Sequence, residues 1–141
     1  MSEIQLFQQY ADAFEATYED DNWNRLESFF AEDAEYDPGD GVKSVGRSAV
    51  IDRLRAAVNG LDRKFDTRAL RSEKPSLDGN TVALRWVMTL CKQGTPDLVL
   101  SGVEYVIYTD GAIKSMQDVF DDGTAETLGG WMAAHQDALN S

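Results

Sequence analysis

The amino-acid sequence predicts an α+β fold, in which helices pack on one face of a curved antiparallel sheet. Apolar residues recur at spacings of three and four through the first third of the chain, which is typical of amphipathic helices. The second half instead contains long apolar segments separated by turns, and Thr109-Asp110-Gly111 is a strong hairpin motif. A shorter helical pattern follows Asp122-Gly123-Thr124. Helices, then a meander of strands, then a helix is the order that indicates this fold class.

Each predicted helix has its own apolar stripe. The first stripe comprises Phe7, Tyr10, Ala11, Phe14 and Tyr18. Asp20-Asp21-Asn22 interrupts this helix, and asparagine is a residue type that caps a following helix. The second stripe comprises Trp23, Leu26, Phe29 and Phe30, and the third comprises Val50, Ile51, Leu54, Ala57, Val58 and Leu61. The last helix carries Leu128, Trp131, Met132, His135 and Leu139.

Alternating apolar residues and flanking turn residues predict the strands. They occupy residues 34–37, 65–74, 81–92, 98–108 and 113–121. Pro38-Gly39-Asp40-Gly41 forms a loop after the first strand, because these residue types favour turns over regular structure. The other four strands follow one another directly and therefore form a meander.

Length and charge restrict the classes of partner. A chain of 141 residues predicts one domain over residues 1–141. Its 13 basic and 25 acidic residues give a net charge of −12, so we expect no binding to nucleic acid or to anionic membranes. No apolar run reaches the ~18 residues of a transmembrane helix. The N-terminus has no basic region followed by an apolar stretch, so we expect a cytoplasmic location.

Cysteine and histidine each occur once, as Cys91 and His135. An intramolecular disulfide, a cysteine-based zinc site and a histidine-rich metal site are therefore excluded. We expect no metal and no cofactor, and carboxylates, tyrosines and arginines remain as candidates for chemistry.

The strand at residues 81–92 is apolar on both faces. One face comprises Val82, Leu84, Trp86, Met88 and Leu90, and the other comprises Ala83, Arg85, Val87, Thr89 and Cys91. A sheet covered by helices on one side only should have a polar opposite side. We therefore expect a homodimer through the sheet, with the row that begins at Val82 packed against the second copy.

Three charged residues interrupt apolar rows: Arg85, Glu104 and Asp118. Each could lie at a strand end that reaches water, whereas together they could line one polar pocket. Asp118 lies between Met116 and Phe120, where an unpaired charge would be costly. We expect Arg85 to pair with Asp118, to hold the pKa of this carboxyl down and to keep it ionised at neutral pH.

Several segments resemble the SnoaL-like and ketosteroid-isomerase-like branch of the nuclear transport factor 2-like superfamily. Residues 23–36 are similar to the family stretch W…L…LFADDA.Y, and Gly46-Arg47-Ser48-Ala49-Val50 resembles its entry to the third helix. Residues 113–120 resemble its last strand. The resemblance implies a cone: a curved sheet wrapped around helices, with an apolar pocket at the wide end and dimerisation through the sheet.

Site residues follow from the resemblance position by position. By comparison with ketosteroid isomerases, Tyr10 and Glu104 would form an oxyanion hole, and Asp37, in an Asp-Pro pair shifted by one residue, would shuttle the proton. By comparison with limonene-epoxide hydrolases, Arg85, Asp118 and Tyr36 match catalytic positions, whereas Val87 replaces an aspartate, so an intact epoxide hydrolase is not expected. The ligand-contacting residues implied are Tyr36, Phe14, Val87, Met116, Phe120 and Trp131.

Two hypotheses of function remain open at the level of the sequence. One is an acid–base isomerase, cyclase or hydrolase that acts on a small, largely apolar polyketide, steroid-like or terpenoid molecule, with Asp118 as the acid or base. The other is a non-catalytic ligand-binding or dimeric scaffold protein, in which Arg85 and Asp118 form a buried ion pair.

Overall fold

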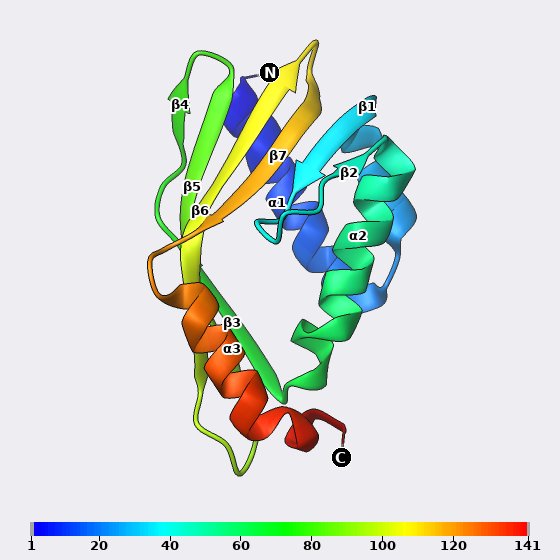
Figure 1. The fold of residues 1–141 in the computed structure, drawn as a ribbon. Coiled ribbons are helices and arrows are strands. Elements are labelled where there is room, and N and C mark those ends of the chain that lie inside the picture. The colour runs from blue at the N-terminus through cyan, green and yellow to red at the C-terminus, as the bar shows by residue number, and fades with distance from the viewer. Residues whose placement is uncertain (1, 141) are drawn as a thin grey trace.

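A computed structural model of the protein describes residues 2–140 (Figure 1). Its centre is one seven-stranded sheet with the order β2-β1-β7-β6-β5-β3, and β4 pairs with β5. The strands are β1 (Phe30–Asp37), β2 (Ser44–Val45), β3 (Thr67–Ser72), β4 (Ser76–Asp78), β5 (Thr81–Cys91), β6 (Leu98–Thr109) and β7 (Ala112–Phe120). The sheet is mixed, because β1 runs parallel to β7 while the other pairs are antiparallel.

Three α-helices accompany the sheet: α1 (Glu3–Asp20), α2 (Arg47–Gly60) and α3 (Thr124–His135). Ser2 and Gln5 form a capping box that starts α1, since each side chain accepts a bond from the other residue's backbone N–H. Short 3₁₀ segments, η1 (Trp23–Phe29), η2 (Asp62–Lys64) and η3 (Gln136–Asn140), complete the chain. In Figure 1, α1 and α2 lie on one side of the sheet, and α3 continues beyond the end of β7.

The α+β fold with a curved sheet is confirmed, with two differences in detail. The second predicted helix is the 3₁₀ segment η1, and Asn22 makes no side-chain cap bond there. The predicted sheet was purely antiparallel, but β1 pairs in parallel with β7. Alternation within a strand does not reveal which distant strand becomes its neighbour, so this pairing could not be read from the sequence.

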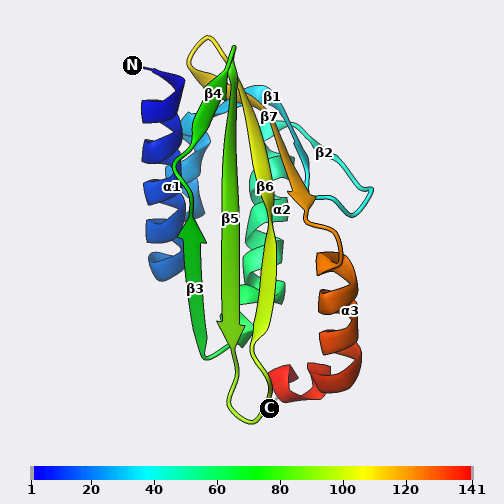
Figure 2. The same ribbon diagram turned by 90° about the vertical axis from the view of Figure 1, so that its left-hand side faces the viewer.

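Strand register divides the sheet into an inner face, which meets the helices, and an outer face. Val82, Leu84, Trp86, Met88 and Leu90 lie on the inner face and join two core clusters. The prediction that this row packs against a second copy is therefore wrong, because the chain's own helices and strands cover it. The outer face of β5 and β6 faces the viewer in Figure 2 with no helix over it.

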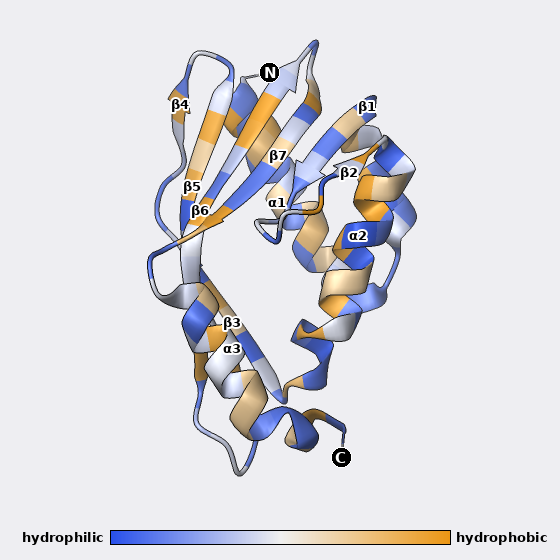
Figure 3. Cartoon of the chain, in the orientation of Figure 1, coloured by the Kyte–Doolittle hydropathy of each residue, from blue (hydrophilic) through white to orange (hydrophobic). Residues whose placement is uncertain are grey.

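Two apolar clusters fill the inner side. The larger joins α1, η1 and α2 to β1, β6 and β7, and the smaller joins α3 and η3 to β5 and β6 around Trp131 and Leu98. Figure 3 shows apolar and polar residues alternating along the strands, as expected for two differently covered faces.

Gly102 lets aromatic rings meet across β6. The register places it between Trp86 of β5 and Phe120 of β7, and a Cβ there would lie 2.5 Å from the carbonyl oxygen of Val119. Because this position has no side chain, the rings of Trp86 and Phe120 approach to 6.0 Å between centroids in an edge-to-face arrangement. This contact lies next to the inner-face row that contains Glu104 and Asp118.

No helix within residues 2–140 is long and apolar enough to cross a membrane.

Candidate functional site

Two carboxylic acids face each other on the inner side of the sheet. The register of β6 and β7 places Glu104 directly opposite Asp118, and the two carboxyl groups lie within hydrogen-bonding reach. The Tyr36 hydroxyl on β1 donates a hydrogen bond of 2.6 Å to Oδ2 of Asp118. Three neighbouring strands therefore bring one phenol and two carboxyl groups together.

Two further tyrosines interact electrostatically with these carboxyl groups, Tyr10 with both of them and Tyr108 with Glu104. Tyr10 extends from α1, is 4% exposed, and packs edge-on against the ring of Phe30 at 5.6 Å. Tyr108 lies near the end of β6 and is 5% exposed. We call these five residues the acid–tyrosine cluster: Tyr10, Tyr36, Glu104, Tyr108 and Asp118.

Burial controls the protonation of this cluster. It raises the pKa of Glu104 well above the ordinary carboxyl range, and the neighbouring Asp118 charge raises it further. Burial also raises the pKa of Asp118, although the bonds from Tyr36 and Glu104 oppose this effect. The hydrogen bond between the two carboxyl groups raises the pKa of Glu104 and lowers that of Asp118, so the shared proton resides on Glu104, which donates to Asp118. The pKa values of the tyrosines also rise, chiefly through burial, so all three stay protonated near neutral pH.

A cavity of about 400 Å³ opens beside Asp118. Its wall contains the end of β7, the start of α3 and Gly39 from the β1–β2 loop. A Cβ on Gly39 would lie 3.0 Å from the carbonyl oxygen of Asp118, and its φ of +92° is one that other residue types rarely adopt. Glycine thus lets the loop lie close against β7 at the edge of the cavity.

Arg85 does not pair with Asp118. It lies on the outer face of β5, where its guanidinium donates to Oδ1 and Oδ2 of Asp121 at 3.1 and 2.9 Å. The expectation that Arg85 keeps the pKa of Asp118 low is therefore wrong. Arg85 pairs with Asp121 instead, and the pKa of Asp118 is raised. Val87 shares this outer face, where it pairs with Ser101 in the ladder, so it does not face the cluster.

The remaining predicted site residues divide between core and cavity. Asp37 alternates with Tyr36 on β1; it accepts a bond from the Gly39 N–H at 2.9 Å, and its charge contributes to the raised pKa of Asp118. Phe120 lines the cavity. Phe14 and Met116 pack in the larger core cluster, and Trp131 packs against Phe65 in the smaller one.

Sequence reasoning assigned no role to Tyr108. The pattern did contain a usable indication, because Tyr108 shares an alternating row with Glu104 and Val106. A polar hydroxyl in that row could have been grouped with Glu104 before the structure was known.

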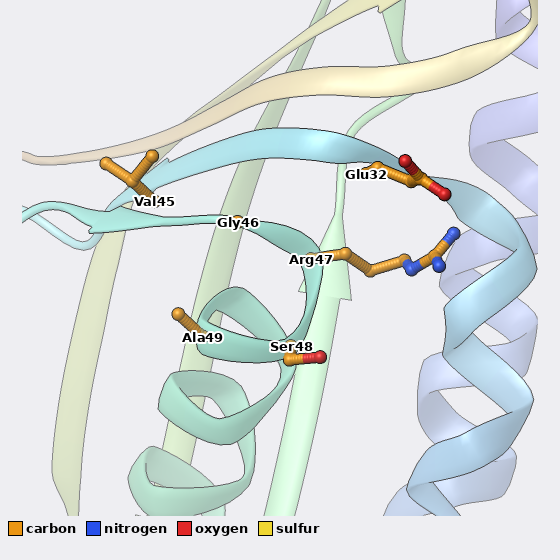
Figure 4. Close-up of a pocket in the computed structure, with 6 residues that line it drawn as sticks. All are labelled: Glu32, Val45, Gly46, Arg47, Ser48 and Ala49. Carbon is orange, nitrogen blue, oxygen red and sulfur yellow. The ribbon is translucent and has the colours of Figure 1, made fainter.

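A second cavity, of about 470 Å³, lies at the start of α2 between Glu32 and residues 45–49 (Figure 4). The Arg47 side chain points toward Glu32 there. No member of the acid–tyrosine cluster lines this cavity, so it is separate from the candidate site. Within residues 2–140, no group of three or more histidine, cysteine, aspartate or glutamate side chains is placed to hold a metal ion.

The raised pKa values of Glu104 and Asp118 predict that the free energy of unfolding falls as the pH rises. A carboxyl whose pKa is raised by folding contributes stability that is present below its unfolded pKa and is lost as the pH rises through the folded pKa. Glu104→Gln removes this dependence and keeps a donor for Asp118. We expect the variant to unfold at a higher urea concentration than wild type at about pH 8, and the difference to vanish at about pH 4.

Urea unfolding across this pH range tests the expectation. Glu32→Gln is the matched control, because Glu32 is exposed and its variant should follow wild type at every pH. An E104Q variant whose stability difference from wild type is the same at all pH values would contradict a raised Glu104 pKa.

A curved mixed sheet wrapped around N-terminal helices, with titratable groups on its inner face, defines the cone-shaped nuclear transport factor 2-like class of α+β proteins. Residues 7–116 match the model of the SnoaL-like domain, and the chain belongs to that family. No curated protein sequence matches the chain.

Three solved structures illustrate the similarity in fold. A hypothetical protein with a ketosteroid-isomerase-like fold from Catenulispora acidiphila, in complex with trimethylamine, is 20% identical, with 89% of this chain and 95% of that chain covered and a TM-score of 0.65. A nuclear transport factor 2-like protein of unknown function from Burkholderia pseudomallei is 17% identical, with 92% and 97% covered and a TM-score of 0.67. An LEH-like epoxide hydrolase of M. tuberculosis is 16% identical, with 92% and 93% covered and a TM-score of 0.62.

Proposed function

We propose that the protein is an acid–base enzyme that moves a proton next to a carbonyl group of a small, largely apolar molecule, as an isomerase or cyclase does. The observation that carries the proposal is the Glu104–Asp118 carboxyl pair, held on the inner face by the Tyr36 hydroxyl at 2.6 Å. Two acids of unequal proton affinity, side by side, supply a base and an acid at the same pH.

Asp118 is the base in this proposal, because it lines the cavity and accepts bonds from its neighbours. Its carboxylate takes the proton from the carbon beside the carbonyl, and negative charge moves to the carbonyl oxygen. Tyr10, whose hydroxyl stays protonated, is the donor for that oxygen, and the Glu104 proton remains in the bond to Asp118. Asp118 then returns the proton to a second carbon, so an isomerisation balances without any co-reactant.

The cavity chemistry supports a neutral substrate. Its charged lining residues are all acidic: Asp118, Asp121, Asp122 and Glu126. A carboxylate or phosphate group on the substrate would be repelled there, while Val119 and Phe120 offer apolar contact. We therefore propose cyclic ketones of the polyketide, steroid-like or terpenoid kind as the substrate class.

Deuterium exchange tests this function without knowledge of the product. A panel of cyclic ketones, β,γ-unsaturated ketones and β-diketones is incubated with the protein in D₂O, and exchange next to the carbonyl is followed by NMR. We expect at least one compound to exchange faster with wild type than with Asp118→Asn. Equal rates with both proteins for the whole panel would contradict an enzyme and leave a binding protein.

We also propose that the protein is a homodimer through the outer face of the sheet. Val99, Tyr105 and Val119 are 47%, 39% and 44% exposed there, on the two neighbouring strands β6 and β7. Wild type is expected to sediment at twice the 15.7 kDa chain mass, and Val119→Arg at the mass of one chain. Val45→Arg, at a 62% exposed position on β2, is the control and should remain dimeric. A wild-type chain that sediments as a monomer at micromolar concentration would refute the dimer.

A further inference from the structure

β7 continues past the end of its neighbour β1 (Figure 1). The parallel pairing of the two strands stops at Asp37 and Gln117, and Pro38 follows directly after β1. From Asp118 to Phe120, β7 therefore has a partner strand on one side only, which is β6. The other side of this segment is an open strand edge, where backbone N–H and C=O groups have no neighbouring strand to bind.

One hydrogen bond determines which backbone groups lie on this open edge. The Asp121 N–H donates to the Ser101 carbonyl at 3.0 Å, which continues the β6–β7 ladder by one residue. Opposed residues of an antiparallel pair alternate between exchanging both backbone hydrogen bonds and exchanging none. Because Asp121 and Ser101 are of the first kind, Phe120 and Gly102 are of the second. The Phe120 N–H is therefore directed away from β6 and toward the open edge.

The cavity of about 400 Å³ lies along this edge. It is lined by Asp118, Phe120 and the start of α3, and by Gly39 on the side where β1 ends. A Cβ on Gly39 would lie 3.0 Å from the Asp118 carbonyl oxygen and 3.8 Å from the Phe120 ring, so the loop lies close against this edge. The Phe120 N–H thus borders a space that water occupies in the free protein and that a ligand can enter.

We propose that the backbone N–H of Phe120 is a further catalytic group, which donates a hydrogen bond to the carbonyl oxygen of the substrate as negative charge develops there. The inference rests on the proposed function, in which Asp118 takes the proton from the neighbouring carbon. It adds a donor on the strand edge to the Tyr10 hydroxyl. A fixed backbone donor of this kind needs no reorganisation during the reaction.

The spacing along β7 suits this division of roles. Asp118 and Phe120 are two residues apart, so their Cα atoms are separated by about 7 Å. The carbon that loses its proton is bonded to the carbonyl carbon, and contacts of about 3 Å at each end of this small group bridge such a separation. A donor is also needed there, because Asp122 and Glu126 line the same cavity and disfavour negative charge on the oxygen.

Replacement of one amide by an ester tests the donor without changing a side chain. Phenyllactate at position 120 has the same ring as Phe120 but an oxygen in place of the N–H. We expect this protein to lose about 10²- to 10³-fold in kcat for deuterium exchange into the ketone panel, with little change in KM. 4-Hydroxyphenyllactate in place of Tyr105, on the outer face of β6, is the matched control and should keep the wild-type kinetics. A wild-type kcat with the ester at position 120 would overturn the inference.

Amide hydrogen exchange of the unmodified protein, followed by NMR, is a second readout that does not depend on turnover. The Val103 N–H lies in the β6–β7 ladder opposite Val119, so the Phe120 amide should exchange faster than the Val103 amide in the free protein. Saturating 2-tetralone, a cyclic ketone of two fused rings, should slow the exchange at Phe120 and leave that at Val103 unchanged. A Phe120 amide that is as slow as Val103 without ligand, or that 2-tetralone does not slow, would contradict the role of this N–H.

The outcomes separate this inference from the proposed function. A Phe120 amide that 2-tetralone protects, together with no deuterium exchange into any ketone, would support the contact and refute the enzyme. Exchange that depends on Asp118 but persists at the wild-type rate with the ester at position 120 would support the enzyme and refute the role of the Phe120 N–H.

Discussion

Asp118→Asn is expected to slow the carbonyl-adjacent deuterium exchange by about 10²- to 10⁴-fold, the usual contribution of one positioned base. Asparagine has the same shape as aspartate, so Tyr36 can still donate to its Oδ1 and the fold should persist. It has no carboxylate to accept a proton from carbon. Exchange rates measured by NMR at saturating ketone concentration check the loss.

The matched control is Asp33→Asn, which makes the same chemical change at an exposed position of β1. Its exchange rate should equal that of wild type, and circular dichroism should show that both variants are folded. An Asp118→Asn variant that retains the wild-type rate would remove Asp118 from the mechanism, whatever the other cluster residues do.

The pH profile gives an independent check on the same residue. Because burial raises the pKa of Asp118, wild-type exchange should decline on acidification at a higher pH than an ordinary aspartate would require. Asp37→Asn removes one negative charge that contributes to this rise. Its profile should therefore move to lower pH, while the rate on the plateau changes little.

The sequence pattern was sufficient for the fold and for part of the site. The strands at residues 81–92 and 98–108 are observed as Thr81–Cys91 and Leu98–Thr109. Asp118 lies between Met116 and Phe120 in one row, as expected. The β6–β7 register pairs these three residues with alternate residues of β6, namely Glu104, Val106 and Gly102. Short-range periodicity decides both features, and periodicity is what a single sequence records directly.

Arg85 shows where that information ends. Alternation assigns residues to two rows but does not say which row faces the helices, and on β5 both rows are apolar enough to be the inner one. Because the row of Arg85 was taken as the inner one, Arg85 was expected beside Asp118 and Val82 was expected at a dimer interface. The true partner of Arg85 is Asp121, just after β7, and it became recognisable only once the β6–β7 register fixed the faces.

The wrong expectation for the direction of the Asp118 pKa shift has the same cause. An aspartate beside a guanidinium titrates below its ordinary range, whereas one beside another carboxyl in a buried setting titrates above it. The sequence contains all the groups involved, but the sign of the shift depends on which of them share a face. For this reason the roles of Asp118 and Glu104 are defined by the register and not by the residue types.

Arg68→Met is expected to lower the free energy of unfolding by about 3–5 kcal/mol, as is usual when one partner of a buried ion pair is removed. The Arg68 side chain is only 7% exposed. It donates to both carboxylate oxygens of Glu15 at 2.7 and 3.2 Å and to Asp62 at 2.8 Å. These bonds connect β3 to α1 and η2, so their loss should weaken the packing of these three elements.

The Asp62 carboxyl explains the size of the effect and offers a rescue. Burial already raises its pKa, and Arg68 is the group that opposes the rise. Without the guanidinium, a buried negative charge remains unpaired, so Arg68→Met should regain part of its stability when Asp62 is also changed to Asn. Urea unfolding of the single and double variants measures both steps.

Arg55→Met, at the exposed pair of Arg55 with Asp52, is the control and should change stability by no more than the error of the measurement. Equal losses in Arg68→Met and Arg55→Met would show that the buried network does not hold the fold.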